Sequence, residues 1–190
     1  MKFNMGCGHN RLDGYVNVDT SPNSTADQIV DLEQTPWPWA DGCADEVLFN
    51  HSLEHMGAEA KVFLAIIQDL YRICADGAVV QINAPHPRHD NFISDPTHVR
   101  IVTPQVMSLF DKANNDQWKS RGHANTPFAH YLQVDFRMES SLTLVDEPYF
   151  SRMQAGELTP LAVRELMQSH NNVATEHRMT LRARKPYGRP

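Results

Sequence analysis

The chain has 190 residues, of which 41% are hydrophobic and 21% charged, and its formal net charge is -6. This length and composition indicate one globular domain, residues 1–190, that is large enough to bury a core, and no apolar run is long enough to span a bilayer. The acidic balance argues against binding to nucleic acid or to an anionic membrane surface.

The cysteines and the first residues favour a cytoplasmic protein. Cys7, Cys43 and Cys74 form no Cys-x-x-Cys pair and are too few and too scattered for a disulfide framework. The chain begins with a strand pattern instead of the charged stretch and apolar segment of a secretory signal. We therefore expect a reducing, cytoplasmic environment.

Residues 1–85 alternate strand, loop and helix signals, which is typical of a parallel sheet flanked by helices. Short strands are predicted over residues 2–5, 16–19, 28–31 and 46–50. Apolar side chains then recur at helical spacing at Val62, Ile66, Leu70 and Ile73, which predicts a helix over residues 58–74. Asp76 and Gly77 are expected to end this helix, and a fifth strand is predicted over residues 78–83.

Residues 86–128 differ in composition from the residues before them, because they are rich in His, Pro, Asn and Asp. One short helix is predicted there, over residues 104–112. Loops this long inside compact domains are usually functional, so we interpret the segment as a lid or substrate segment. Residues 129–186 follow as C-terminal strands and a helix: alternation predicts strands over 132–138 and 177–183, and Thr159-Pro160 caps a helix reaching about Ser169.

Two acidic residues follow short strands near a glycine motif. The first strand runs into Met5-Gly6-Cys7-Gly8, and the second ends at Asp19. Glycines let the backbone approach a ligand closely, and a carboxylate at the end of the second strand can accept hydrogen bonds from ribose hydroxyls. Asp31 can accept from an adenine amine, while Leu32 offers an apolar surface to the ring. These residues predict a site for an adenosine cofactor at the carboxyl ends of the strands.

Taken in order, the motifs resemble the class I S-adenosylmethionine-dependent methyltransferases, and more narrowly a small stand-alone branch with a Gly-Cys-Gly first motif. The resemblance covers residues 2–85 and rests on Met5-Gly6-Cys7-Gly8, Asp19, Asp31-Leu32, Asp45-Glu46-Val47, Leu53-Glu54-His55 and Arg72-Ile73-Cys74-Ala75-Asp76-Gly77-Ala78. It implies a Rossmann-like three-layer α/β sandwich with a mostly parallel seven-stranded sheet and an antiparallel last strand. It also implies S-adenosylmethionine as cofactor and S-adenosylhomocysteine as product.

The resemblance and the strand ends together define the expected site. The predicted cofactor-binding residues are Met5, Gly6, Cys7, Gly8, Asp19, Asp31, Leu32, Asn50 and His51. Asn50 and His51 are included because they leave the fourth strand near the expected position of the sulfonium. A hydroxyl or amine acceptor would benefit from a general base, for which histidine has a suitable pKa. His86, directly after the fifth strand, is the first candidate base, followed by His51 and His55.

Two features depart from the family pattern. Residues 9–18 are too few for a full crossover helix between Gly8 and Asp19, and no helix pattern precedes the first strand. One sheet face would then be thinly covered, so a homodimer is a reasonable hypothesis, and the acceptor site would be capped by residues 86–128 or by another subunit. The acidic charge and the lack of a nucleic-acid module favour a small molecule or a sugar hydroxyl or amine as acceptor.

Three alternatives from other classes stay open. The first is a non-catalytic, methyltransferase-like binding or interaction module. The second is a zinc peptidase, because His51-Ser52-Leu53-Glu54-His55 spells the inverted His-x-x-Glu-His signature. That signature needs both histidines on one helical face, whereas the preceding residues read as strand.

The third alternative is a metal site in the histidine-rich segment. His86 and His89 could bind a metal together with Asp90, Asp95 or His98. Pro85 and Pro87 instead imply an extended loop, so we expect no bound metal. The Pro36-Trp37-Pro38-Trp39 turn is likewise expected to pack against the sheet edge and not to line a substrate site.

Overall fold

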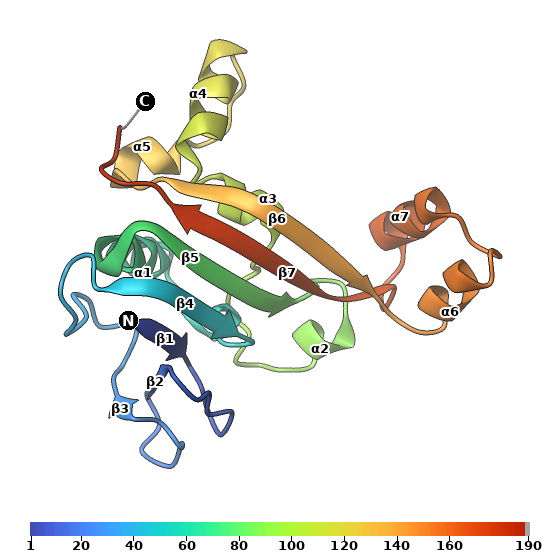
Figure 1. Cartoon of the computed structure of the whole chain (residues 1–190). Coiled ribbons are helices and arrows are strands. Elements are labelled where there is room, and N and C mark those ends of the chain that lie inside the picture. The colour runs from blue at the N-terminus through green and yellow to red at the C-terminus, as the bar shows by residue number, and fades with distance from the viewer. Residues whose placement is uncertain (189–190) are drawn as a thin grey trace.

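A seven-stranded mixed sheet organises the structure, a computed structural model that describes residues 1–188 (Figure 1). The strands lie in the order β3-β2-β1-β4-β5-β7-β6. They are β1 Lys2–Met5, β2 Val16–Asp19, β3 Gln28–Ile29, β4 Ala44–Asn50, β5 Cys74–Pro85, β6 Phe136–Val145 and β7 Ala174–Ala183. Strands β1 to β5 pair in parallel, whereas β7 runs antiparallel to both β5 and β6. The predicted α/β sandwich, with a mostly parallel sheet and an antiparallel last strand, is confirmed.

The helices follow β4 in the chain. They are the 3-10 helix η1 Leu53–His55 and the α-helices α1 Ala60–Ile73, α2 Asp90–Ile93, α3 Pro104–Ser108, α4 Lys112–Ser120, α5 Phe128–Leu132, α6 Tyr149–Gln154 and α7 Pro160–Ser169. The connection from β1 to β2 is a loop, as the short spacing of residues 9–18 predicts. Within residues 1–188, no helix has the length and apolar character needed to cross a membrane.

Helix α1 ends earlier than its sequence suggests. Cys74 already has an extended backbone, with φ -63° and ψ 137°, and it pairs with Ala44 as the first residue of β5. The prediction that Asp76 and Gly77 end the helix is therefore wrong. Both residues lie inside β5, where the register against β4 shifts and Gly77 takes a φ of 81°.

The segment of residues 86–128 holds more helix than predicted. Beyond α3 it contains α2 and the polar helix α4, which lacks an apolar stripe and so gives no periodic signal. Local hydrogen bonds hold α4 instead: Asp111 accepts from the Asn114 amide, and the buried Asn115 side chain donates to the Leu109 carbonyl. The strand predicted from residue 132 begins only at Phe136, because α5 extends to Leu132.

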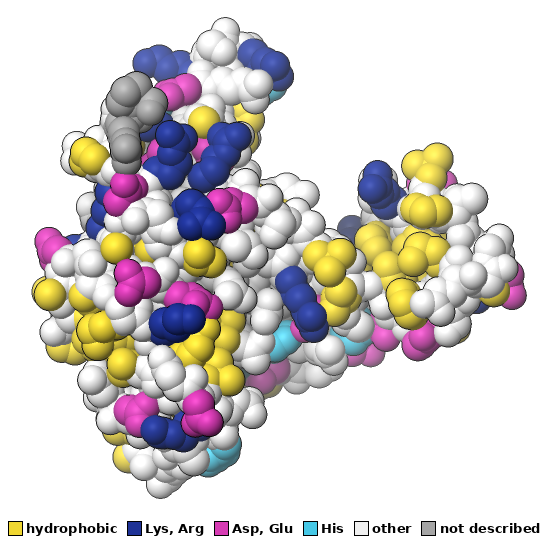
Figure 2. All heavy atoms as spheres, viewed as in Figure 1, with side chains coloured by type: hydrophobic (Ala, Val, Ile, Leu, Met, Phe, Trp, Pro, Cys, Tyr) yellow, Lys and Arg dark blue, Asp and Glu magenta, His cyan; other side chains and the backbone are white. Residues whose placement is uncertain are grey.

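The two faces of the sheet differ in chemistry. Val47, Phe49 and Ile82 are fully buried and belong to one core with α1, which lies behind the sheet in Figure 1. On the opposite face, Gln81 donates to Glu46, and charged side chains of both signs mix with apolar ones (Figure 2). This is the pattern of a sheet with one solvated face. A homodimer covering this face stays a prediction.

A single arginine holds the tryptophan turn against α1. Arg72 donates to both carboxylate oxygens of Asp69, at 2.6 and 3.1 Å, and to the carbonyls of Trp37 and Trp39, at 3.0 and 2.7 Å. Asp69 also accepts from the Trp37 amide at 2.7 Å. Both indoles are buried in the core, with the Trp39 ring against Phe3 of β1, so the expectation that this turn packs against the sheet is confirmed.

We expect Arg72→Met to lower the free energy of unfolding by about 2–3 kcal/mol, because the buried Asp69 carboxylate keeps the Trp37 amide but loses its cation, and two carbonyls lose their donor. Urea unfolding followed by tryptophan fluorescence measures this loss. Arg182→Met is the matched control, since Arg182 also forms a two-pronged pair, with Glu139, but on the surface. The loss of unfolding free energy in Arg182→Met should stay below about 1 kcal/mol. Equal losses in the two variants would contradict a stabilising role of the buried Arg72–Asp69 pair.

A buried histidine on β7 makes stability depend on pH. His177 is 7% exposed, and burial, reinforced by nearby His86, lowers its pKa from 6.5 to about 4. Between these pH values the unfolded chain binds a proton on His177 and the folded chain does not. The contribution of His177 to stability is therefore present above about pH 6.5 and is lost as the pH falls toward 4.

Because of His177, the free energy of unfolding should fall by about 2 kcal/mol between pH 7 and pH 5. His177→Gln, which can still pair with the Thr143 hydroxyl, should show a correspondingly smaller loss. Urea unfolding at the two pH values measures the difference. An unchanged pH dependence in the variant would show that His177 titrates normally in the folded protein.

Candidate functional site

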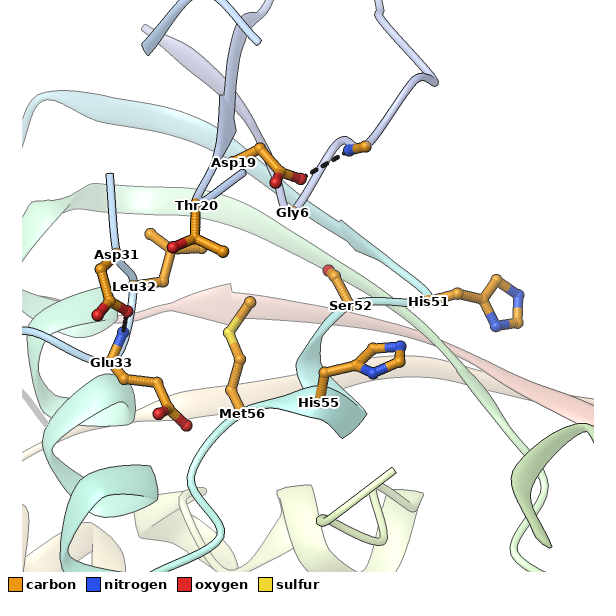
Figure 3. A pocket seen from close by; sticks show the side chains of 11 residues that line it. Gly6, Asp19, Thr20, Asp31, Leu32, Glu33, His51, Ser52, His55 and Met56 are labelled. Carbon is orange, nitrogen blue, oxygen red and sulfur yellow. Dashed lines mark hydrogen bonds between the residues drawn. The ribbon is translucent and has the colours of Figure 1, made fainter. Parts of the chain in front are cut away.

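A cavity of about 510 Å³ opens where β1, β2 and β4 end, and its size is that of a small-molecule site. Figure 3 shows acidic residues at one end and histidines at the other. The lining residues are Gly6, Gly8, Asp19, Thr20, Asp31, Leu32, Glu33, His51, Ser52, His55 and Met56. The carboxyl edge of a parallel sheet, where neighbouring strands diverge into loops, is where such folds bind ligands.

The glycine loop is pressed against the end of β4. The amides of Gly6 and Cys7 both donate to the Val18 carbonyl, at 2.8 and 2.9 Å, and the Ser52 hydroxyl donates to the Met5 carbonyl at 2.7 Å. Gly6 has a φ of +70°, and a Cβ atom there would lie 2.5 Å from Ser52 Cβ. Only glycine allows this approach.

Asp19 joins the loop to β2. Its Oδ2 accepts from the Gly8 amide and its Oδ1 from the Ser21 amide, both at 2.8 Å. These two bonds fix the orientation of the carboxylate, and each oxygen keeps a further lone pair for a ligand. Gly8 has open space where a Cβ would stand, so the loop backbone is accessible from the cavity.

The acidic end of the cavity is set by backbone contacts. Asp31 Oδ1 accepts from the Glu33 amide at 3.0 Å, and Glu33 in turn accepts from the Gly57 amide. The Trp37 indole donates to the Leu32 carbonyl at 3.0 Å. The buried tryptophan turn thus holds the chain that carries Asp31 and Leu32 at the cavity wall.

At the other end, His51 is held between two carboxylates. Its backbone is left-handed, with a φ of 52°, and its Nε2 lies 2.8 Å from Glu176, which also accepts from Arg178 at 2.6 Å. The neighbouring Glu54 carboxyl raises the pKa of His51, as Glu176 does, whereas burial opposes the shift. His51 therefore keeps its proton to a higher pH than a free imidazole does.

The cavity brings together most, but not all, of the predicted site. Gly6, Gly8, Asp19, Asp31, Leu32, His51 and His55 line it. Met5 lies in the core, and Cys7 and Asn50 line a separate, smaller cavity. Asn50 accepts from Asn83 at 2.8 Å.

His86, the first candidate base, does not line this cavity. Strand β5 continues to Pro85, and the His86 amide donates to the Thr175 carbonyl, so the residue stays with β7. Its ring packs against His177, with centroids 4.9 Å apart, and burial lowers its pKa. The antiparallel pairing that places it there joins segments far apart in sequence.

Sequence reasoning missed Thr20, Glu33, Ser52 and Met56 in the cavity wall. Thr20 and Glu33 follow predicted site residues directly, at Asp19 and Leu32. Reading each loop one residue further would have found these two. Ser52 and Met56 depend on the turn that follows β4, for which the sequence has no periodic signal.

The His-x-x-Glu-His motif does not lie on an α-helix. It runs from the turn directly after β4 into the short helix η1, and the two histidines have different partners. His51 contacts Glu176, whereas His55 Nδ1 lies 2.9 Å from the Thr97 hydroxyl. The shared helical face that a zinc peptidase of this type requires is therefore not formed.

Comparison with protein-family models finds no match, and neither does comparison with curated proteins. Solved structures do match. A methyltransferase dependent on S-adenosylmethionine, from Archaeoglobus fulgidus, superposes with a TM-score of 0.61 at 15% identity, over 95% of this chain and 85% of that one. A possible histamine N-methyltransferase from Thermotoga maritima gives 0.53 at 12%, over 97% and 82%.

The [4+2]-cyclase SpnF also matches, with a TM-score of 0.52 at 12% identity, over 96% of this chain and 75% of that one. At such identities the likeness shows the fold alone. The chain has the fold of the class I S-adenosylmethionine-dependent methyltransferases. Because one fold can host different reactions, the activity has to be argued from the cavity.

Two glycine variants test the close approach at the cavity. Gly6→Ala and Gly8→Ala both place a side chain at positive φ, a strain of about 1–2 kcal/mol each, but only Gly6→Ala also meets Ser52. We expect Gly6→Ala to lower the free energy of unfolding by at least about 1 kcal/mol more than Gly8→Ala. Equal losses in urea unfolding of the ligand-free proteins would contradict the contact.

Proposed function

We propose that the chain is an S-adenosylmethionine-dependent methyltransferase whose acceptor is a small molecule or a sugar hydroxyl or amine. The observation that carries the proposal is the convergence of a glycine loop and two strand-end acids on one cavity at the carboxyl edge of the sheet. The cavity has the volume for such a cofactor. Its acidic end suits the adenosine part of the cofactor, and its histidine end suits the sulfonium.

The lining residues suggest how the cofactor lies. Asp31 and Leu32 suit the adenine, by accepting from its amine and by covering its ring. Asp19, fixed by two amides, offers its remaining lone pairs to the ribose hydroxyls. The partly exposed backbone of Gly8 suits the methionine part. The sulfonium would then lie toward the end of the cavity where His51 and His55 stand (Figure 3).

When bound, S-adenosylmethionine supplies an already activated methyl group for in-line transfer to the acceptor. The protein then has to align the acceptor and exclude water. His51 lies at this end of the cavity, and Glu54, with Glu176, raises its pKa. His86 lies off the cavity wall, so His51 and His55 are the candidate bases that remain at this end.

Calorimetric titration with S-adenosylmethionine and S-adenosylhomocysteine tests the proposal. We expect micromolar binding to the wild type, and a loss of roughly tenfold or more in Asp19→Ala and in Asp31→Ala, since each removes a charged acceptor. Asp45→Ala is the matched control, because Asp45 lies at the opposite end of β4 and binds the chain's amino terminus.

Folded wild type that binds neither compound would overturn the proposal, as would equal affinities in all three variants. Circular dichroism confirms that each variant is folded. Transfer of labelled methyl groups to a panel of hydroxyl and amine compounds then separates an active enzyme from a non-catalytic binding module.

A further inference from the structure

We propose that Glu54, His55 and His98 bind a divalent transition-metal ion at the histidine end of the cavity. One carboxylate oxygen of Glu54 and one ring nitrogen of each histidine lie within 4.8 Å of one another. Glu54 and His55 belong to η1, whereas His98 comes from the loop between α2 and α3. The site thus joins the cavity wall to the predicted substrate segment.

Glu54 is the strongest indication of a bound cation. Its side chain is 1% exposed, and neither carboxylate oxygen has a hydrogen-bond partner among residues 1–188. A buried carboxylate without hydrogen-bond partners is costly, so it favours positive charge in addition to its longer ion pair with the His51 ring. The nearest ring nitrogen of His51 is 3.7 Å away, beyond hydrogen-bond distance, and Arg100 instead donates to the carbonyls of Gly57 and Ala58.

The loop that brings His98 is fastened to η1. The amides of Val99 and Arg100 both donate to the Glu54 carbonyl, at 3.0 and 2.9 Å. The rings of His55 and His98 meet at a centroid distance of 4.5 Å. The backbone therefore holds the two histidines and the carboxylate together before any ion binds, which reduces the ordering cost of binding.

The hydrogen bonds fix the tautomers of both histidines. The Thr97 hydroxyl donates to Asp95 at 2.6 Å, so toward His55 Nδ1 it accepts. The Phe92 carbonyl, 3.0 Å from His98 Nδ1, can only accept. Both Nδ1 atoms therefore carry the proton, and both Nε2 atoms keep a lone pair for a metal. In metal-binding histidines, the ring nitrogen that does not bind the metal typically donates to an oxygen in this way.

The ligand types select the kind of ion. Two imidazole nitrogens and one carboxylate oxygen suit zinc, iron, cobalt or nickel better than calcium or magnesium, which prefer oxygen. Three protein ligands leave coordination positions open, and the exposed His55 lies at the cavity. A hydroxyl or carboxylate oxygen of the acceptor would suit these positions; this last step rests on the proposed function.

Titration of the tag-free, metal-stripped protein with Co²⁺, without cofactor, tests the site. We expect one Co²⁺ per chain, with visible absorption bands of nitrogen and oxygen ligation and Kd in the micromolar range or below. Glu54→Gln and His98→Gln should each weaken binding at least roughly tenfold, and Thr97→Val, which removes the anchor of His55, by roughly tenfold. His86→Gln is the matched control, because His86 is also in ring contact with a histidine, His177, and should leave Co²⁺ binding unchanged.

Thermal unfolding gives a second readout. Zn²⁺ should raise the Tm of the wild type but not of Glu54→Gln, whose metal-free Tm should match or exceed that of the wild type because a buried charge has been removed. If Glu54→Gln does not fold, His98→Gln carries the test.

Folded wild type that binds no Co²⁺, or variants that bind it as tightly as the wild type, would overturn the proposal. So would an equal loss of binding in His86→Gln. A separate titration with S-adenosylhomocysteine distinguishes the two proposals: metal binding without cofactor binding overturns only the proposed function, and cofactor binding without metal binding overturns only the metal site.

Discussion

The contact between the Gly6 backbone and Ser52 is the constraint on which the site depends. Strand β1 lies between β2 and β4, so the chain leaving it has to turn in the narrow space between two neighbours. Two amides of the turn share the Val18 carbonyl of β2, while Ser52 beyond β4 binds the last carbonyl of β1. A side chain at Gly6 would separate these strand ends. The cavity exists because three strand ends are held together at one edge.

The two ends of the cavity are built from different parts of the chain. The acidic end comes from the loops after β2 and β3 and is supported by the buried tryptophan turn, which Arg72 ties to α1. The histidine end comes from the turn after β4. The segment of residues 86–128 reaches this end through its amide contacts with the Glu54 carbonyl. The loops held by the tryptophan turn thus form one end of the cavity, and the predicted substrate segment is attached at the other.

The parts of the site that follow from local sequence could be predicted. Gly6, Gly8, Asp19 and Asp31 lie at or shortly after the ends of short strands, and the carboxyl ends of parallel strands meet at one edge. The five parallel strands could be predicted as well, because strand, loop and helix signals alternate along residues 1–85. The long helix was predicted almost to its ends, because its apolar stripe faces the core.

The wrong predictions concern features that are set by contacts between segments far apart in the sequence. The position of His86 is set by pairing of β5 with β7, and the end of α1 by pairing of Cys74 with Ala44. Helix α4 is polar and relies on side-chain caps, so hydrophobic periodicity cannot reveal it. His98 joins Glu54 only because the intervening chain folds back onto η1, and no spacing in the sequence signals this.

The cofactor site is tested most directly by mapping S-adenosylhomocysteine on the protein through the NMR shifts of its backbone amides. If the cofactor binds at the carboxyl edge of the sheet, saturation should shift the amides of Gly6, Gly8 and Leu32 most. Lys119 and Gly122, which line a separate cavity beside α4, should keep their positions. Shifts centred on that second cavity, or no shifts at millimolar ligand, would contradict a cofactor site at the carboxyl edge of the sheet.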